Sequence, residues 1–162
     1  MAIHKLDIGD FDEIDYHLIA IHTALEDYRL AYLINQKLDI NLSKNKNEIQ
    51  INVKQGESFF SRFYDHTIEK GITWNLIQNK NEVIQQKKDN DQNLFSNLTL
   101  EVLTKVHLIP EFKKVDYFLK IENLEETIHL TNVLARLNRI DTISAIYTVE
   151  TNKIKSKNNL IF

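Results

Sequence analysis

The sequence predicts a single α+β domain, and three observations support this. The chain has 162 residues, 43% of them hydrophobic and 27% charged, which is enough to bury one core. Short apolar or alternating runs are frequent, as in strands, and two stretches near Thr23 and Asn123 have the caps of helices. We expect a mostly antiparallel sheet of about six to seven strands with two main helices on one face, formed by residues 1–150 and followed by a basic tail over residues 151–162.

The first third of the chain predicts a strand, a helix and a second strand. Residues 16–22 (YHLIAIH) are short and mostly apolar, which is typical of a strand buried on both faces. A Thr-x-x-Glu capping box over residues 23–26 predicts a helix that continues to about Leu38. Residues 41–47 form a polar loop, and residues 48–54 alternate between apolar and polar side chains, which predicts a half-buried strand.

Two runs that flank the tripeptide Glu69-Lys70-Gly71 predict a β-hairpin. A three-residue loop with glycine last suits a type I turn closed by a bulge. The expected register pairs Ile68 with Ile72 and His66 with Trp74, because it gathers apolar side chains on one face.

The next stretch predicts a loop and two strands. Residues 85–93 contain no apolar residue, so we expect a solvated loop. From Leu98 onward apolar residues recur at every second position, which predicts a strand that Pro110 ends, since proline donates no ladder hydrogen bond. We expect the following strand, residues 115–121, to return antiparallel to it.

The end of the domain predicts a second helix and a last strand over residues 143–149. The helix opens at Asn123 with an Asn-x-x-Glu box. Its predicted apolar stripe consists of Leu124, Ile128, Thr131, Leu134, Ala135 and Leu137 or Asn138.

A weak internal repeat suggests how these elements connect. Asp15-Tyr16 and Asp116-Tyr117 each begin a strand that leads into a capped helix. With a further strand after each helix, the pattern is a strand–helix–strand duplication, the ferredoxin-like plan, with inserted hairpins between the halves. The alternative is that any short strand leading into a capped helix produces this likeness.

Composition excludes several classes of protein. The chain contains no cysteine, which excludes disulfides, thiol nucleophiles and cysteine-ligated metals. The net charge of −3 and the scattered cations argue against nucleic-acid binding, which needs a basic stripe. No apolar run approaches the roughly 18 residues of a membrane span. Because the first residues turn acidic where an export signal would be basic and then apolar, we expect a cytoplasmic protein.

Familiar catalytic and cofactor motifs are also missing. His17 and His22 lie five residues apart, so they point to opposite faces of a strand, and no histidine pair has metal-ligand spacing. No Gly-x-Ser-x-Gly elbow occurs, and three separated glycines cannot form a phosphate-binding loop. We therefore predict neither a metal nor a cofactor.

One motif has the form of a family signature. Ile109-Pro110-Glu111 and Val115-Asp116-Tyr117 together spell Ile-Pro-Glu-x-x-x-Val-Asp-Tyr. The chain resembles the IPExxxVDY family, a small bacterial family found largely in Bacteroidetes, whose function is unknown. The resemblance implies no activity, cofactor or catalytic residue.

The motif has two physical interpretations. In the first, Pro110 makes a rigid corner, Glu111 accepts amide hydrogen bonds, and Asp116 pairs with a lysine or a tyrosine hydroxyl. In the second, Glu111, Asp116, Tyr117 and Tyr16 surround a pocket as binding or acid–base groups. An extended strand weakens the second interpretation, because Asp116 and Tyr117 then face opposite sides.

By elimination, we predict a non-catalytic binding or interaction domain. Its partner would be an unknown protein, or a small ligand between helices and sheet, and a homodimer through an open sheet edge would also fit. One alternative is a small enzyme whose carboxylates and histidines are dispersed in the sequence. A second alternative is an RNA-associated protein that stacks bases on Phe63 or Tyr117.

Overall fold

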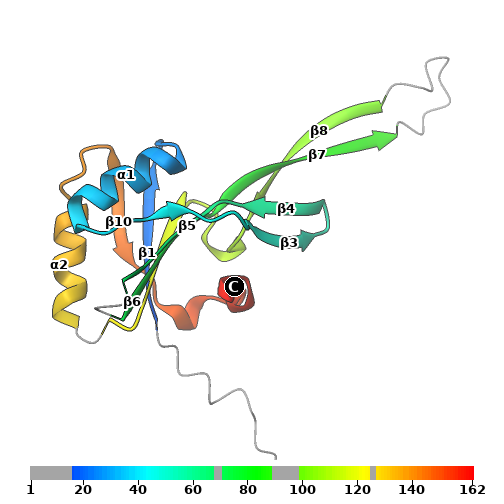
Figure 1. Cartoon of the computed structure of the whole chain (residues 1–162). Helices are drawn as coiled ribbons and strands as arrows, with labels where there is room; N and C mark the ends of the chain where they lie inside the picture. Colours follow the sequence, from blue (N-terminus) through cyan, green and yellow to red (C-terminus); the bar gives the residue numbers. More distant parts are fainter. Residues whose placement is uncertain (1–15, 68–70, 89–98, 125–126) are drawn as a thin grey trace, which may run out of the picture.

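The computed structural model describes residues 16–67, 71–88, 99–124 and 127–162 (Figure 1). The strands are β1 (Tyr16–Thr23), β2 (Ser43–Lys44), β3 (Ile49–Val53), β4 (Gly56–Phe60), β5 (Arg62–Thr67), β6 (Ile72–Gln78), β7 (Lys80–Lys88), β8 (Thr99–His107), β9 (Tyr117–Glu122) and β10 (Ile143–Thr148). The helices are α1 (Asp27–Leu38) and α2 (Thr127–Leu137), with short 3-10 helices at η2 (Pro110–Phe112), η3 (Thr151–Lys153) and η4 (Lys157–Leu160). The predicted α+β class is confirmed. No helix in the described ranges has the length and apolar character needed to cross a bilayer.

Six strands form the main sheet, in the order β10-β1-β9-β6-β5-β2, and every neighbouring pair is antiparallel. Helix α1 follows β1 and helix α2 follows β9, so the four strands β10-β1-β9-β6 contain two strand–helix–strand units, β1–α1–β6 and β9–α2–β10. The strands of the two units alternate in the sheet. This is the strand order of the ferredoxin-like plan. The additional strands include two hairpins, β3–β4 and β7–β8, that form separate two-stranded sheets.

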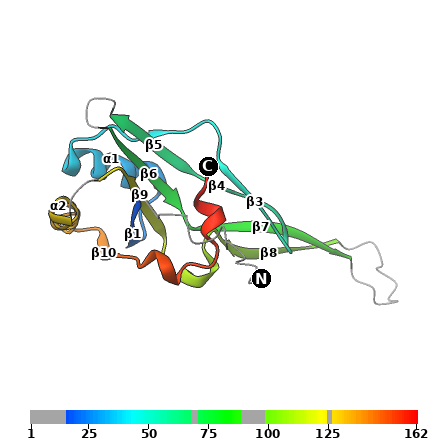
Figure 2. The ribbon, with the colours of Figure 1, turned by 90° about the horizontal axis from the view of Figure 1, so that it is seen from below.

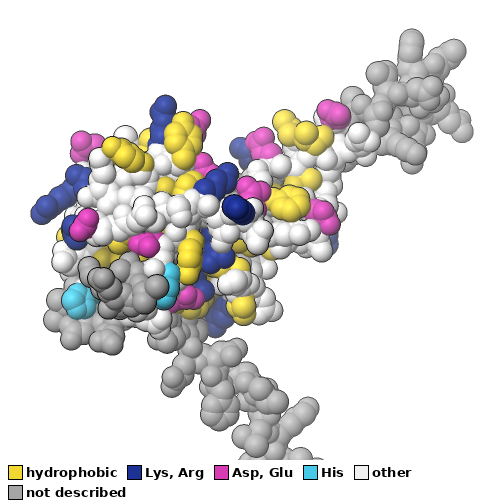
Figure 3. Space-filling model, viewed as in Figure 1, with side chains coloured by type: hydrophobic (Ala, Val, Ile, Leu, Met, Phe, Trp, Pro, Cys, Tyr) yellow, Lys and Arg dark blue, Asp and Glu magenta, His cyan; other side chains and the backbone are white. Residues whose placement is uncertain are grey.

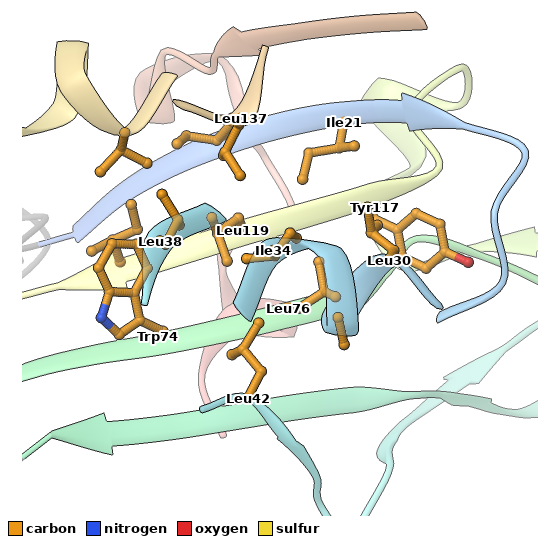
Figure 4. Close-up of a cluster of buried hydrophobic side chains, with 14 of the residues drawn as sticks. Ile21, Leu30, Ile34, Leu38, Leu42, Trp74, Leu76, Tyr117, Leu119 and Leu137 are labelled. Carbon is orange, nitrogen blue, oxygen red and sulfur yellow. The ribbon is translucent and has the colours of Figure 1, made fainter. Parts of the chain in front are cut away.

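Both predicted helices pack against the same face of the main sheet (Figures 1 and 2). Apolar side chains from alternate positions of the strands meet the buried sides of the helices. Figure 4 shows this cluster, the helix-side core. Its central members are Ile21, Leu30, Ile34, Leu38, Trp74, Leu76, Leu119 and Leu137.

The opposite face of the sheet is also covered, which the sequence analysis did not anticipate. Strand residues Leu18, Ile77 and Phe118 are buried there. Leu108, Ile109 and Val115 from the segment after β8 and Ile154 and Leu160 from the C-terminal segment belong to the same cluster, and the β3–β4 hairpin adds Ile49 and Phe60. The sheet therefore has a core on each face: the helix-side core and, on the opposite face, a second core.

The first helix begins later than its capping motif predicts. Thr23 is the last residue of β1, and α1 begins at Asp27 with no side-chain cap. The Thr23 amide donates to Asp116 Oδ2 and its hydroxyl donates to the Thr142 carbonyl, so tertiary contacts hold it in the strand. The Thr23 hydroxyl still accepts a local hydrogen bond from the Leu25 amide (3.2 Å), but it caps no helix. The capping-box interpretation was wrong because partners about a hundred residues away hold Thr23 in β1.

The β5–β6 hairpin forms, but its register differs by one residue from the expected one. His66 pairs with Thr73, and Asp65 pairs with Trp74. The shift places Phe63 opposite Leu76, on the face that α1 covers, where Phe63 is 6% exposed. Burial of Phe63 outweighs the turn preference, while Ile68 lies outside the described residues.

Other expectations also needed correction. Residues 85–88, predicted as loop, belong to β7, which pairs with β8, while residues 89–93 lie outside the described ranges. The strand after Pro110 pairs with β1 and β6 rather than with β8. Residues 43–44 of the predicted polar loop form β2. On α2, Leu130, Val133 and Leu137 are buried, whereas Thr131 and Ala135 of the predicted stripe are exposed.

If the C-terminal segment belongs to the second core, its buried residues should contribute to the stability of the fold. Leu160 is 1% exposed, whereas its neighbour Ile161 is 77% exposed. We expect Leu160→Ala to lower the free energy of unfolding by about 2–5 kcal/mol and Ile161→Ala to change it by less than about 0.5 kcal/mol. Chemical denaturation measures both values, and equal effects would show that the segment does not belong to the core.

Candidate functional site

The Ile-Pro-Glu-x-x-x-Val-Asp-Tyr motif lies where a projecting hairpin joins the body. Strands β7 and β8 form a two-stranded arm that extends away from the main sheet (Figures 1 and 2). The chain enters this arm between β6 and β7, and it returns to the sheet through residues 108–116, before β9. The motif therefore spans the return path at the base of the arm.

Asn79, between β6 and β7, holds this base together. Its side-chain Nδ2 donates to the carbonyls of Phe112 (2.9 Å) and Val115 (2.8 Å), and its Oδ1 accepts from the Ile109 amide (2.9 Å). Its backbone adds bonds from the Leu108 amide and to the Asp116 carbonyl, each 2.9 Å. Asn79 is fully buried, and its side chain uses both amide protons and its oxygen. Sequence reasoning missed this residue.

Asp116 joins three elements at the same place. Its Oδ1 lies 2.6 Å from Lys80 Nζ at the start of β7, and its Oδ2 accepts from the Thr23 amide at the end of β1 (2.9 Å). The carboxylate thus connects the arm to β1 and to the start of β9. This arrangement agrees with the interpretation in which Asp116 pairs with a lysine.

Glu111 binds the C-terminal segment. Its Oε1 accepts from the amides of Lys155 and Ser156 (both 2.9 Å) and from the Ser156 hydroxyl (3.0 Å). Partial burial alone would raise the pKa of Glu111. Hydrogen bonds from its own backbone and from Ser156 and Lys155 outweigh that effect and hold the pKa below its ordinary value.

Tyr117 points toward the helices. Its hydroxyl donates to the Leu25 carbonyl (2.8 Å), and the side chain is 7% exposed in the helix-side core. Burial, together with the nearby carboxylates of Asp27, Asp116 and Glu26, raises the pKa of Tyr117 to about 12. Its hydroxyl is therefore a hydrogen-bond donor and not an acid near neutral pH.

Tyr16 lies on the opposite face of the sheet. The Nζ of Lys120 is 4.9 Å from the Tyr16 ring centre and 4.9 Å from the Phe162 ring centre. Burial, and then the charge of Glu122, raises the pKa of Tyr16. In the described part of the chain, no hydrogen bond or ion pair joins any two of Glu111, Asp116, Tyr117 and Tyr16. The structure places these four residues at separate junctions of the fold.

The arm itself has two different faces. Val83 and Gln85 face the β3–β4 hairpin, where Gln85 Nε2 donates to the Gln55 carbonyl. Ile84 and Leu103, paired across the ladder, lie on the other face and are 60% and 64% exposed. The space-filling view shows hydrophobic side chains on the surface of the projecting part (Figure 3). The arm therefore presents an apolar cross-strand pair to solvent.

On the exposed face of the arm, charged and polar pairs flank the apolar pair. Glu82 lies opposite Lys105 on one side, and Gln86 lies opposite Glu101 on the other. All four side chains are exposed. The face consequently presents an apolar centre with a polar border, which is the usual anatomy of a protein interface.

Two other predicted chemistries find less support. Phe63 and Tyr117, proposed for base stacking, are 6% and 7% exposed in the helix-side core, so neither offers a free ring face. Within the described ranges, no three His, Asp or Glu side chains form a group that could hold a metal ion. The enzyme alternative stays a prediction without a located site.

Comparison of the chain with protein-family models, with curated proteins and with solved structures gives no match. The resemblance to the IPExxxVDY family therefore stays a prediction.

The role of Asn79 can be tested by truncation. Asn79→Ala leaves the buried Ile109 amide without its acceptor and the buried Val115 carbonyl without its donor, and it removes one of the two donors to the Phe112 carbonyl. We therefore expect a loss of about 2–5 kcal/mol in unfolding free energy. Hydrogen exchange in β7 and β8 should accelerate as well. Asn52→Ala, at an exposed position of β3, serves as the control. A loss under about 1 kcal/mol, with unchanged exchange, would contradict this role.

The hydrogen bonds of Glu111 predict a pH-dependent stability. Because the pKa of Glu111 is lower in the folded chain than in the unfolded chain, its contribution is present above the unfolded pKa and is lost as the pH falls through the folded pKa. Glu111→Gln should lower Tm near neutral pH, and the difference from wild type should shrink as the pH falls below about 4. Glu57→Gln, an exposed glutamate on β4, is the control. A difference independent of pH would refute the assignment.

Proposed function

We propose that this chain is a non-catalytic interaction protein that binds a protein partner through the β7–β8 arm. The observation that carries the proposal is the exposed Ile84–Leu103 pair on an arm whose base is fixed by Asn79 and Asp116. The resemblance to the IPExxxVDY family and the cytoplasmic location accompany this proposal as expectations from the sequence.

The fixed base of the arm supports binding rather than a merely flexible extension. Asn79 and Asp116 connect the first residues of β7 with the path that leaves β8, so both strands are anchored at the same end. A binding surface that is held in place before contact loses less conformational freedom on association. The buried polar network at the base thus favours an arm that is preorganised for a partner.

The partner whose chemistry fits best is a second copy of the chain. A two-fold axis parallel to the strands would place Lys105 over Glu82 of the copy, with Ile84 against Leu103 of the copy. A two-fold axis across the strands would place Lys105 over Glu101 of the copy, with like apolar residues in contact. Both arrangements pair Lys105 with a carboxylate and oppose no like charges, so the face is complementary to itself.

The size of the apolar centre sets the expected strength of this contact. Complete burial of an isoleucine or leucine side chain is worth about 1.5–3 kcal/mol, and each chain contributes two side chains that are already partly covered. Association costs about 4–15 kcal/mol of translational and rotational freedom. We therefore expect a reversible dimer whose population rises with protein concentration.

Sedimentation velocity over a range of concentrations tests this dimer. The mass should rise from one chain of 19.1 kDa toward that of two chains. Leu103→Ser should keep the protein monomeric at unchanged Tm, because Leu103 is 64% exposed. Tyr32→Ser, on an equally exposed part of α1, should leave the dimer intact and is the matched control.

Charge reversal identifies the arrangement. Lys105→Glu should weaken the dimer, and a second change should restore it: Glu82→Lys if the axis follows the strands, or Glu101→Lys if it crosses them. A wild-type protein that stays monomeric at millimolar concentration would overturn the proposal. So would a dimer that Tyr32→Ser disrupts and Leu103→Ser does not.

A further inference from the structure

A second surface feature, distant in sequence from the arm, lies between the helices and the sheet. It is a pocket of about 330 Å³ at the C-terminal end of α1, closed by β6 and α2. Its apolar wall is formed by Leu38, Ile40, Ile72, Trp74, Leu124 and Val133, and its polar wall by Asp39, His129, Asn132 and Arg136. A cavity of this size that combines an apolar wall with a few polar side chains is suited to a small molecule that carries both apolar and polar groups.

Trp74 is central to the apolar wall. Its indole ring lies at the end of the helix-side core beside Leu38 (Figure 4) and is 6% exposed. Unlike Phe63 and Tyr117, Trp74 lines a cavity, so the small exposed part of its ring provides an apolar contact at the cavity wall. Packing in the helix-side core holds this part of the wall in place.

Arg136 gives the pocket an available positive charge. His129, Asn132 and Arg136 are three and four residues apart on α2, so they lie along one side of the helix. Among the described residues, no hydrogen bond or ion pair engages the Arg136 guanidinium. A guanidinium beside an apolar cavity is suited to bind a carboxylate with two hydrogen bonds.

Asp39, the residue after the end of α1, gives the pocket a negative charge. It follows α1 with a φ of 55°, in the left-handed region, and its amide donates to the Asn35 carbonyl. Outside glycine, only Asp39 and Asn123 have a positive φ in the described ranges, and Asn123 precedes the lining residue Leu124. The carboxylate of Asp39 can accept hydrogen bonds from a ligand ammonium group.

We infer that this pocket binds an α-amino acid with an aromatic or large apolar side chain. The ligand carboxylate would pair with Arg136, its ammonium group with Asp39, and its side chain with Trp74 and Val133. This inference does not depend on the function proposed for the arm, because none of these residues belongs to β7 or β8. The cation Arg136, the anion Asp39 and the apolar wall lie in the same cavity, and they match the three chemical groups of such an amino acid.

Trp74 is the only tryptophan of the chain and lines the pocket, so tryptophan emission reports on the surroundings of this one side chain. L-phenylalanine, which does not absorb where tryptophan is excited, should change the Trp74 emission in a saturable way and should raise Tm. The probes 3-phenylpropionate and phenethylamine each lack one of the two charges and should bind at least about tenfold more weakly. Arg136→Gln should weaken L-phenylalanine binding to a similar degree.

Two variants control for folding. Arg139→Gln changes an arginine near the same end of α2 that does not line the pocket, and should leave binding unchanged. Asp39→Asn removes the charge but tolerates the left-handed conformation, so it should weaken binding without a large change in Tm. The inference is wrong if L-phenylalanine at millimolar concentration alters neither the emission nor Tm. It is equally wrong if all three probes bind alike, or if Arg139→Gln weakens binding as much as Arg136→Gln.

Discussion

The fold of the described residues depends on the hydrogen bonds that the buried Asn79 makes with the path back from the arm. At this residue the chain leaves the main sheet for the arm, and the five hydrogen bonds of Asn79 fix the return path from Leu108 to Asp116. A buried amide whose donors and acceptor are all satisfied is strongly constraining, because any displacement leaves polar groups without partners away from water. The same return path carries Leu108, Ile109 and Val115 into the second core. Polar and apolar interactions at the base of the arm therefore stabilise one conformation.

This arrangement gives the residue types and spacing of the Ile-Pro-Glu-x-x-x-Val-Asp-Tyr motif a physical explanation. Ile109 supplies an amide to Asn79 and an apolar side chain to the core. Pro110 opens a 3-10 turn, from which Glu111 reaches the C-terminal segment. Asp116 then ties the path to Lys80 and Thr23. Each position has a structural contact, so the motif needs no catalytic role to account for its residue types.

Local patterns predicted much of this fold, and distant contacts decided the rest. Period-two alternation located β3 and β8, and Pro110 marked the end of β8, because these signals are contained within a few residues. The register of β5–β6 and the start of α1 depended on Phe63 and Thr23, whose partners come from other elements. The motif indicated a rigid corner, but Asn79, which hydrogen-bonds its backbone at Ile109 and Val115, lies 30 or more residues away. An isolated asparagine gives no signal in the sequence that would identify it as this partner.

The distribution of polar groups also separates structure from function in this chain. At the base of the arm, Asn79, Asp116 and Glu111 direct their polar atoms to other residues of the same chain. On the arm and in the helix–sheet pocket, the pattern is reversed: Ile84 and Leu103 lie in solvent, and Arg136 has no ion pair among the described residues. Groups that already have intramolecular partners stabilise the fold, whereas accessible groups without them can gain free energy from a second molecule. The residues of the motif therefore act mainly within the fold, and the arm and the pocket offer the groups that a second molecule could bind.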